Sequence, residues 1–470
     1  MSSQMHNTAP EPQGKFVHQI ASSRTTPSPL GSAPCEAGPA RSITRAWAVT
    51  IMLVLLAVVN WMDKAVLGMV AVPLMAELKL SPTEYGTLAG AIYFLFSFSA
   101  ATVGFLANHR SAKWILFWMA ALWSICQFSI WLAPSFAVIL ISRILLGLGE
   151  GPASGLSYHA VGKWFQDGER NLPIALQSIG AFAGIAVAAP GLTWVVSHYS
   201  WHAAFLTVGL VGLIWMFVWT FVGKEGPYSG GSTSTQNPSF AETDLKVPYR
   251  KLFLNPTFIG ATSVGFVAYW ALTIVSAWLP AYLRKGQGYS ADHTASIMLG
   301  VSLTAIFFLA TQAMTAQALM ARGVSTRIAR GVMASASVVI AGGLIVASTM
   351  IAPGGVQTAT ICLGFGLVLV TFTTGAAIIS EFSPVRQRGA LLGIYVGTLS
   401  LSGVICPSVF GFIVQQNGSG IDGYHTAILI SGILIAFGGI IGLLLINPQR
   451  EVNAVARLIQ LQRKTEALVD

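Results

Sequence analysis

The sequence predicts an all-α membrane protein with twelve transmembrane helices in two six-helix halves. Three observations predict this fold: the composition, the number of long apolar runs and the distribution of basic residues. Of the 470 residues, 54% are hydrophobic and only 9% are charged, whereas a soluble domain carries about 25% charged residues. A mean hydropathy of +0.67 and 48 glycines are typical of a helical protein that crosses the membrane many times.

Twelve apolar runs reach the ~20 residues that a helix needs to cross a bilayer. They lie at 46–76, 84–107, 113–132, 136–160, 172–196, 203–222, 257–283, 291–319, 326–350, 355–380, 389–415 and 423–446. The fourth run is the most interrupted, with Gly147, Gly149, Gly151 and Gly155 near Pro152. Small residues permit close contact between helices, and proline is tolerated where neighbours satisfy the backbone.

The basic residues predict the orientation. Of the 26 lysines and arginines, only Lys79, Arg284 and Lys285 fall in loops on the side opposite the N-terminus, while Lys64 and Arg143 lie inside spans. Positively charged loops remain in the cytoplasm. The bias therefore predicts an even number of helices with both termini cytoplasmic, and it explains the net charge of +9 without nucleic-acid binding.

The apolar runs divide the chain into five parts. Residues 1–45 are rich in Pro, Ser, Thr and Ala and are expected to be a disordered cytoplasmic segment. A six-helix bundle at 46–222 is followed by a Gly- and Ser-rich cytoplasmic linker at 223–255, a second bundle at 256–447 and a cytoplasmic tail at 448–470. Transporters built from two related halves bind substrate near the bilayer midplane, between the halves.

Four charged residues stand where lipid disfavours them: Asp63 and Lys64 in the first span, and Arg143 and Glu150 in the fourth. Each such charge costs about 3 kcal/mol at a helix centre, so the four must pair or face a water-filled cavity. Asn60, Asp63 and Lys64 are spaced at i, i+3 and i+4, which predicts that they share one helix face.

The spacing of Arg143, Gly147 and Glu150 likewise predicts a common face on the fourth helix. One interpretation is structural, with ion pairs that join the first and fourth helices. The other is functional: a cation attracts an anion and a carboxylate exchanges a proton. The two are compatible, because an ion pair broken by protonation is a switch. Sodium remains an alternative to the proton, which we favour because each acid has a basic neighbour.

The spans of the second half contain almost no charge. Glu381 closes the tenth helix near Arg386 and Arg388, which predicts a gate or a pairing at the helix end. The other polar or aromatic residues that this half offers are Tyr269, Trp270, Trp278, Tyr395 and Ser400. Proton and charge handling is therefore expected in the first half.

Several motifs together resemble a known family. They are Asn60-x-x-Asp63-Lys64, Leu80-Ser81-x-x-Glu84-x-Gly86, Trp123-Ser124, Arg143-x-x-x-Gly147-x-Gly149-Glu150, Trp164-Phe165-x-x-x-Glu169-Arg170, Trp201-x-x-x-Phe205, Trp278-Leu279-Pro280-x-Tyr282-Leu283 and Gly403-x-x-x-Pro407-x-x-x-Gly411. The layout resembles the major facilitator superfamily, and specifically its anion:cation symporter family, which includes bacterial carriers of sugar acids, tartrate and phthalate.

The resemblance implies proton-coupled import of a small organic carboxylate across the bacterial inner membrane, by a monomer without cofactor or metal. Asp63 and Glu150 match the proton-titrating acids of the family. Lys64 and Arg143 match their basic partners, with Lys64 contacting the substrate carboxylate, and Tyr93 falls near an aromatic residue that faces the cavity.

Departures from the family pattern suggest which substrate is carried. Lys64 stands where the family usually has Arg, and lysine cannot make a bidentate fork with a carboxylate. Trp61 replaces a common Tyr, and Ala181, Val396 and Ser400 stand near positions where sugar-acid carriers tend to have amides. The cavity is therefore expected to suit an aromatic or less hydroxylated acid.

The loop after the second helix is the other candidate gate. Asn108 replaces an acid that helps to latch the halves in relatives, and Arg110 follows it. The candidate substrate-binding residues are Asn60, Trp61, Lys64, Tyr93, Arg143 and Ser400.

Other functions were weighed against uptake. An efflux antiporter or a facilitator is an alternative, although antiporters typically carry Gly-Pro in the fifth helix, where this chain has Ala189-Pro190. An enzyme would need a nucleophile and base or a metal cluster, and the eight histidines and four cysteines show no such spacing. A nucleotide-driven pump would need a phosphate-binding loop, which the sequence lacks. A transporter that acts as a sensor would normally append a larger soluble domain than residues 447–470.

Overall fold

The computed structural model describes residues 42–96, 98–99, 111–165, 169–228, 247–372 and 374–466. Eleven helical segments in this part of the chain are long and apolar enough to cross a membrane. The predicted second span at 84–107 is described only in part. Residues 1–41 of the predicted N-terminal segment and the gating candidates Asn108 and Arg110 lie outside the described residues.

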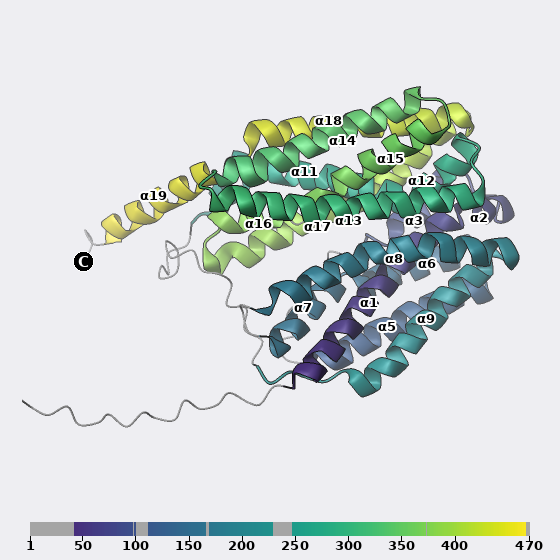
Figure 1. The fold of residues 1–470 in the computed structure, drawn as a ribbon, viewed down its shortest axis with the longest axis horizontal. Helices are drawn as coiled ribbons and strands as arrows, with labels where there is room; N and C mark the ends of the chain where they lie inside the picture. The colour runs from purple at the N-terminus through teal and green to yellow at the C-terminus, as the bar shows by residue number, and fades with distance from the viewer. Residues whose placement is uncertain are drawn as a thin grey trace, which may run out of the picture. The chain divides into compact units, whose positions relative to one another are not determined.

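The first half is built from eight described helices (Figure 1). They are α1 (Ile43–Met69), α2 (Ala71–Glu77), α3 (Pro82–Ala91), α5 (Ala112–Leu132), α6 (Phe136–Glu150), α7 (Ala153–Trp164), α8 (Asn171–His198) and α9 (Trp201–Val222). Helix α1 packs along α8 and α9, and α5 packs on α6 and α9. Helices α1 and α6, which carry the predicted charges, therefore each pack against other helices of this half.

The second half is built in a similar way from more fragmented helices. They are α10 (Tyr249–Phe253), α11 (Pro256–Thr273), η3 (Ile274–Trp278), α12 (Leu279–Ala281), η4 (Tyr282–Gly286), α13 (Ala291–Ala321), η5 (Arg327–Val332), α14 (Met333–Met350), α15 (Gly355–Val368), η6 (Leu369–Phe372), α16 (Thr374–Phe382), α17 (Val385–Gln416), α18 (Ile421–Leu445) and α19 (Pro448–Glu466). Helix α14 packs on α15 and α18, and α11 packs on α17 and α18.

Serine side chains define where several helices begin. The first backbone N–H groups of a helix have no partner within it, and a preceding side-chain oxygen can accept from one of them. Ser135, Ser200 and Ser290 cap α6, α9 and α13 in this way. At α3, Ser81 and Glu84 form a reciprocal capping box.

The fourth span, predicted at 136–160 and the most interrupted by glycine, is divided into two helices. Helix α6 ends at Glu150 and α7 begins at Ala153, with Gly151 and Pro152 between them. Proline has no backbone N–H and its ring clashes with the preceding turn. Gly151 also lies so close to the carbonyl of Phe96 that a Cβ would collide with it. The break places Glu150 at a helix end.

The two halves touch directly at one end of the bundle, which we name the closed end. There a Cβ on Gly68 of α1 would collide with the Ser276 carbonyl of η3, and one on Gly86 of α3 would collide with the Pro407 carbonyl of α17. Only glycine permits such close backbone approach. The π-helical segment η3 lies at this contact, in line with the tendency of such irregularities to occur at functional positions.

Aromatic side chains complete the closed end. The Tyr85 hydroxyl donates to the carbonyls of Leu67 (3.1 Å) and Ala277 (2.7 Å), which belong to different halves. The Trp278 indole donates to the Pro407 carbonyl at 3.0 Å and packs edge-on against the Tyr85 ring at 4.8 Å between centroids. These bonds join α1, α3, η3 and α17.

At the opposite end, where α7 ends and α8 begins, the chain after α9 is tied to the first half. The Glu225 carboxylate accepts from Lys163 Nζ at 2.6 Å, from the Ser111 hydroxyl at 2.7 Å and from the Lys113 backbone N–H at 3.2 Å. The Trp164 indole donates to the Lys224 carbonyl at 3.1 Å. The predicted linker at 223–255 is therefore anchored at its start.

The C-terminal part of the predicted linker is also anchored. The backbone of Val247 both donates to and accepts from the Gln387 side-chain amide, at 3.0 and 2.7 Å. Helix α10 follows within the predicted linker, and α19 occupies most of the predicted tail. Residues 229–246 lie outside the described residues.

We expect Gly68→Val to destabilise the protein by about 1–3 kcal/mol, because the added side chain would overlap the backbone of η3. Thermal unfolding of the detergent-purified protein measures the effect. The matched control is Gly191→Val in α8, where an added Cβ meets no atom within 4 Å. Equal loss of stability in both variants would contradict the close contact at the closed end.

We expect Glu225→Gln to lower the Tm at neutral pH by about 2 °C, equivalent to about 1 kcal/mol for a partly exposed charged contact. Burial raises the pKa of Glu225, but hydrogen bonds from Lys163, Ser111 and the Lys113 backbone outweigh it, so the pKa lies below the ordinary value. The carboxylate therefore stabilises the fold above the unfolded pKa, and this contribution disappears as pH falls through the folded pKa. The difference in Tm between wild type and variant should accordingly close on acidification, whereas Lys224→Gln, at the exposed neighbour, should show no such trend.

Candidate functional site

A cavity of about 570 Å³ lies between the two halves. Helices α1, α7 and α8 supply most of one wall, and α11, α13, α16 and α17 supply the other. The polar or charged residues in its lining are Asn60, Lys64, Glu150, Ser154, Ser157, Tyr158, His159, Gln177, Ser178, Tyr269 and Tyr395. The lining extends from Lys64 and Glu150 to the exposed Tyr158 in the middle of α7. The cavity therefore reaches toward the end opposite the closed end.

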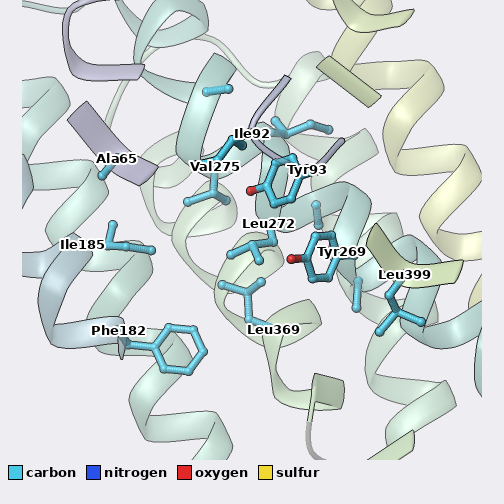
Figure 2. Packing of buried hydrophobic residues seen from close by; sticks show 14 of the residues in the cluster. Ala65, Ile92, Tyr93, Phe182, Ile185, Tyr269, Leu272, Val275, Leu369 and Leu399 are labelled. Carbon is cyan, nitrogen blue, oxygen red and sulfur yellow. The ribbon is translucent and has the colours of Figure 1, made fainter. Parts of the chain in front are cut away.

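Figure 2 shows the packing of buried hydrophobic residues from both halves. Phe182 and Ile185 of α8 lie at the left of the view, with Leu272, Tyr93 and Tyr269 to their right. Phe182 and Tyr269 both line the cavity. The rings of Tyr93 and Tyr269 pack edge-on at 5.5 Å between centroids and connect the two halves.

Lys64 is the cation of this cavity. Its ammonium group forms an ion pair with the Glu150 carboxylate and donates to Asn60 Oδ1 at 2.6 Å. It also lies 5.3 Å from the centre of the Trp61 ring and 5.7 Å from that of Phe96, distances at which an aromatic face attracts a cation. Lys64 is 9% exposed and Glu150 is 2% exposed. A largely desolvated ion pair thus forms the deep wall.

Asp63 is placed differently from the prediction. It is 1% exposed, does not line the cavity, and accepts a hydrogen bond from Gln127 Nε2 of α5 at 2.7 Å. Successive residues turn by about 100° around a helix, so Asp63 and Lys64 diverge although Asn60 lies between their directions. The expectation of one shared face was therefore right for Asn60 and Lys64 but wrong for Asp63.

Arg143 stabilises the backbone rather than pairing with a carboxylate. It donates to the Asp63 carbonyl at 3.0 Å and lies 5.8 Å from the Phe205 ring centre. Within the described residues, its Nε and Nη2 atoms are buried without a hydrogen-bond partner. Of the two ion pairs that the structural interpretation predicted between the first and fourth helices, only Lys64–Glu150 is formed.

The remaining predicted residues lie in three places. Trp61 lines the cavity with its ring 6.0 Å from that of Phe182. Tyr93 instead borders a space of about 10 Å³ beside Lys64 and Arg143, which is close to the least space that can hold one water molecule. Ser400 is buried away from the cavity and donates to the Val396 carbonyl at 3.0 Å.

Glu381 forms polar contacts at the end of α16. This corresponds to the second of its two predicted roles, a gate or a pairing at the helix end. It accepts from the Thr326 hydroxyl at 2.8 Å and from Arg330 Nη1 at 3.4 Å. These partners come from the eighth-to-ninth loop and η5. No cluster of metal-ligating residues occurs in the described part of the chain.

Sequence analysis missed two polar residues of the site. Gln127 holds Asp63, and Gln177 lines the cavity on α8. Both are uncharged amides inside apolar spans, and such a polar residue within a span is the feature of the sequence that could have identified them. Gln177 stands one helical turn before Ala181, the position where the analysis noted a missing amide.

Comparison with known proteins gives the family. The sequence profile of the Major Facilitator Superfamily matches residues 53–374. The hexuronate transporter of Bacillus subtilis is 28% identical over 426 residues, covering 85% of this chain and 94% of that protein. The D-galactonate transporter of Escherichia coli O6:H1 is 21% identical over 425 residues, covering 87% and 97%.

Solved structures show the same fold. A bacterial homologue of the human lysosomal transporter Spinster, in an inward-facing and unoccupied conformation, superposes with a TM-score of 0.71 at 17% identity and covers 88% of this chain and 99% of its own. A D-xylose–proton symporter gives a TM-score of 0.68 at 16% identity, covering 86% and 99%. The matched profile spans most of the described helices, and these relatives are transporters rather than enzymes. The chain belongs to the Major Facilitator Superfamily and is a multi-pass membrane transporter.

Proposed function

We propose that the protein imports a small organic carboxylate together with protons, by alternating access and as a monomer. The observation that carries the proposal is the buried Lys64–Glu150 ion pair in the wall of the cavity between the halves. The names of the hexuronate and D-galactonate transporters, both carriers of organic acids, support the substrate class. The family resemblance of the acidic residues supports the proton.

The ion pair couples the two solutes. Lys64 has one ammonium group, and Glu150 and Asn60 already engage it. A substrate carboxylate that took this ammonium away would leave Glu150 charged and unpaired in a buried site, at a cost of about 3–5 kcal/mol. Protonation of Glu150 removes that cost. Substrate and proton therefore bind together, and release of one favours release of the other.

Asp63 is the second proton-binding candidate. Its Oδ1 accepts from Gln127, whereas its Oδ2 is buried without a hydrogen-bond partner in the described residues. A carboxyl proton on Oδ2 would not disturb the bond to Gln127. Arg143 holds the adjacent backbone at the Asp63 carbonyl, so protonation at this site would be transmitted to the contact between α1 and α6.

The positions of the cavity and of the closed end support an inward-facing state. The bias of lysine and arginine puts both termini in the cytoplasm of a bacterial cell and the closed end outside. The cavity reaches from Glu150 toward Tyr158, on the cytoplasmic side in this orientation. Tyr85 and Trp278 then seal the outer side. The alternating state would require these bonds to break.

The cavity wall favours an aromatic or sparsely hydroxylated acid. Trp61, Phe96, Phe182, Tyr269 and Tyr395 supply aromatic surface to the cavity, and the rings of Trp61 and Phe96 lie next to the ammonium group. Ala181 contributes a methyl group to the lining, near a position where sugar-acid carriers tend to have an amide. Such a wall desolvates a flat apolar body while Lys64 holds its carboxylate.

We expect Glu150→Gln to abolish proton-driven accumulation while counterflow exchange of substrate survives, because the amide preserves the shape of the site but cannot exchange a proton. Uptake of labelled carboxylates into vesicles containing the purified protein, with and without an inward proton gradient, measures both. A parallel sodium gradient tests the alternative ion, and Asp292→Asn at the exposed start of α13 is the control. Gradient-independent uptake, or unchanged accumulation in Glu150→Gln, would point instead to a facilitator or an exporter.

We expect Lys64→Gln to weaken substrate binding by about 100-fold, corresponding to about 3 kcal/mol for the loss of a charged contact in a buried site. Lys64→Arg should retain much of the affinity because the charge is kept. Counterflow exchange is the measurement, since it needs no proton gradient. Lys285→Gln removes an exposed lysine outside the cavity and serves as the control. The proposal fails if Lys64→Gln exchanges substrate as well as wild type.

A further inference from the structure

A second polar group lies in the cavity away from Lys64. Gln177 of α8 is 4% exposed and lines the cavity, and its Nε2 atom has no hydrogen-bond partner in the described residues. His159 of α7 also lines the cavity, and its Nε2 atom is likewise buried and unpaired. A buried polar atom without a partner is costly. Both side chains are therefore available to a group brought by a ligand.

The spacing along α8 separates this pair from the ammonium group. Gly184 lies against Val58 and the Cβ of Trp61, which is one residue after Asn60, the partner of Lys64. Gln177 precedes Gly184 by seven residues, or about 10 Å along the helix. Phe182 lies between the two levels and packs against Trp61.

The fourth span independently gives a similar separation between the two polar groups. His159 follows Glu150 by nine residues, so the two side chains are separated by about 13 Å along this span. Glu150 marks the level of Lys64 because the two form an ion pair. The polar lining is thus arranged as two groups with aromatic surface between them.

The chemistry of the second group differs from that of the first. A glutamine amide can donate and accept, and a histidine ring presents one donor and one acceptor when neutral. Of the residues that the structure describes, Lys64 and Glu150 are the only lysine, arginine or acidic side chains in the cavity lining. The second group therefore suits a neutral hydroxyl or carbonyl rather than a second charged group.

We propose that Gln177 and His159 form a distal subsite that binds a neutral hydrogen-bonding group at the far end of an elongated carboxylic acid. This inference rests on the proposed function, because it takes the carboxylate to be held at Lys64. The transported acid then has three parts: a carboxylate at Lys64, a flat apolar middle along the surface that Trp61 and Phe182 present to the cavity, and a hydroxyl or carbonyl at the subsite.

The experiment compares two acids that differ only at the distal end. Binding of 4-hydroxycinnamate and of cinnamate to the purified full-length protein is measured by calorimetry. We expect wild type to bind 4-hydroxycinnamate about five- to tenfold more tightly, the effect of one hydrogen bond to a buried group. Gln177→Leu should reduce this ratio to about one, with little effect on cinnamate.

Ser178→Ala is the matched control. Ser178 is the next residue of α8 and lines the same cavity, but its hydroxyl already donates to the Ile174 carbonyl at 3.3 Å. The ratio should therefore be unchanged in this variant. His159→Phe provides a second test, with a reduced ratio expected, should Gln177→Leu fail to fold.

Three results would overturn the distal subsite: equal affinities in wild type, an unchanged ratio in a folded Gln177→Leu or His159→Phe variant, or no binding of either acid. Failure of the subsite is distinguished from failure of the proposed function by measuring the same acids, and glucuronate, with the Lys64→Gln variant. If wild type binds any of these acids and Lys64→Gln does not, carboxylate recognition at Lys64 stands even though the distal subsite fails. Binding that is indifferent to Lys64 would refute the proposed function itself.

Discussion

An ammonium group and a carboxylate held together away from water constrain the arrangement of the first half. Lys64 and Glu150 belong to helices that must approach closely enough for their charges to meet, because an uncompensated buried charge costs several kcal/mol. The glycines of α6 serve its packing on other helices: a Cβ on Gly147 would collide with the Ile92 carbonyl at the end of α3, and one on Gly149 would press on the Trp123 ring of α5. Helix α6 thus meets α1 through a charge and meets α3 and α5 through small residues.

The two halves of the transporter divide the chemistry between them. Among the described residues of the cavity lining, the charged ones, Lys64 and Glu150, belong to the first half, whereas the second contributes Tyr269, Leu309, Tyr395 and neighbouring apolar groups. A movement of one half against the other therefore changes what surrounds the ion pair without breaking it. This fits a mechanism in which protonation and substrate binding, rather than the movement itself, decide when the pair separates.

Closure at one end depends on backbone contacts more than on side-chain charges. Gly68 and Gly86 bring α1 and α3 onto carbonyls of η3 and α17, and the Tyr85 hydroxyl bonds to carbonyls in both halves. These neutral contacts can be exchanged for water or other partners at modest cost. A strong ion pair at the same place would hold the halves in one state. The end with the Glu225 contacts instead ties elements of the first half and the linker to one another.

The sequence by itself determined the class of protein, most of the apolar spans and the need of Lys64 and Glu150 for a partner or a cavity, because charges inside 20-residue apolar runs demand a special environment. It also indicated close packing at Gly147. The tertiary structure decided what no spacing rule contains: that Asp63 turns to Gln127, that Arg143 serves a carbonyl, and that Ser400 is outside the cavity. Periodicity along one helix predicts the direction of a side chain only approximately. The neighbouring helix that the side chain contacts belongs to a distant part of the chain, and the periodicity does not identify it. Gln177 became part of the site for the same reason.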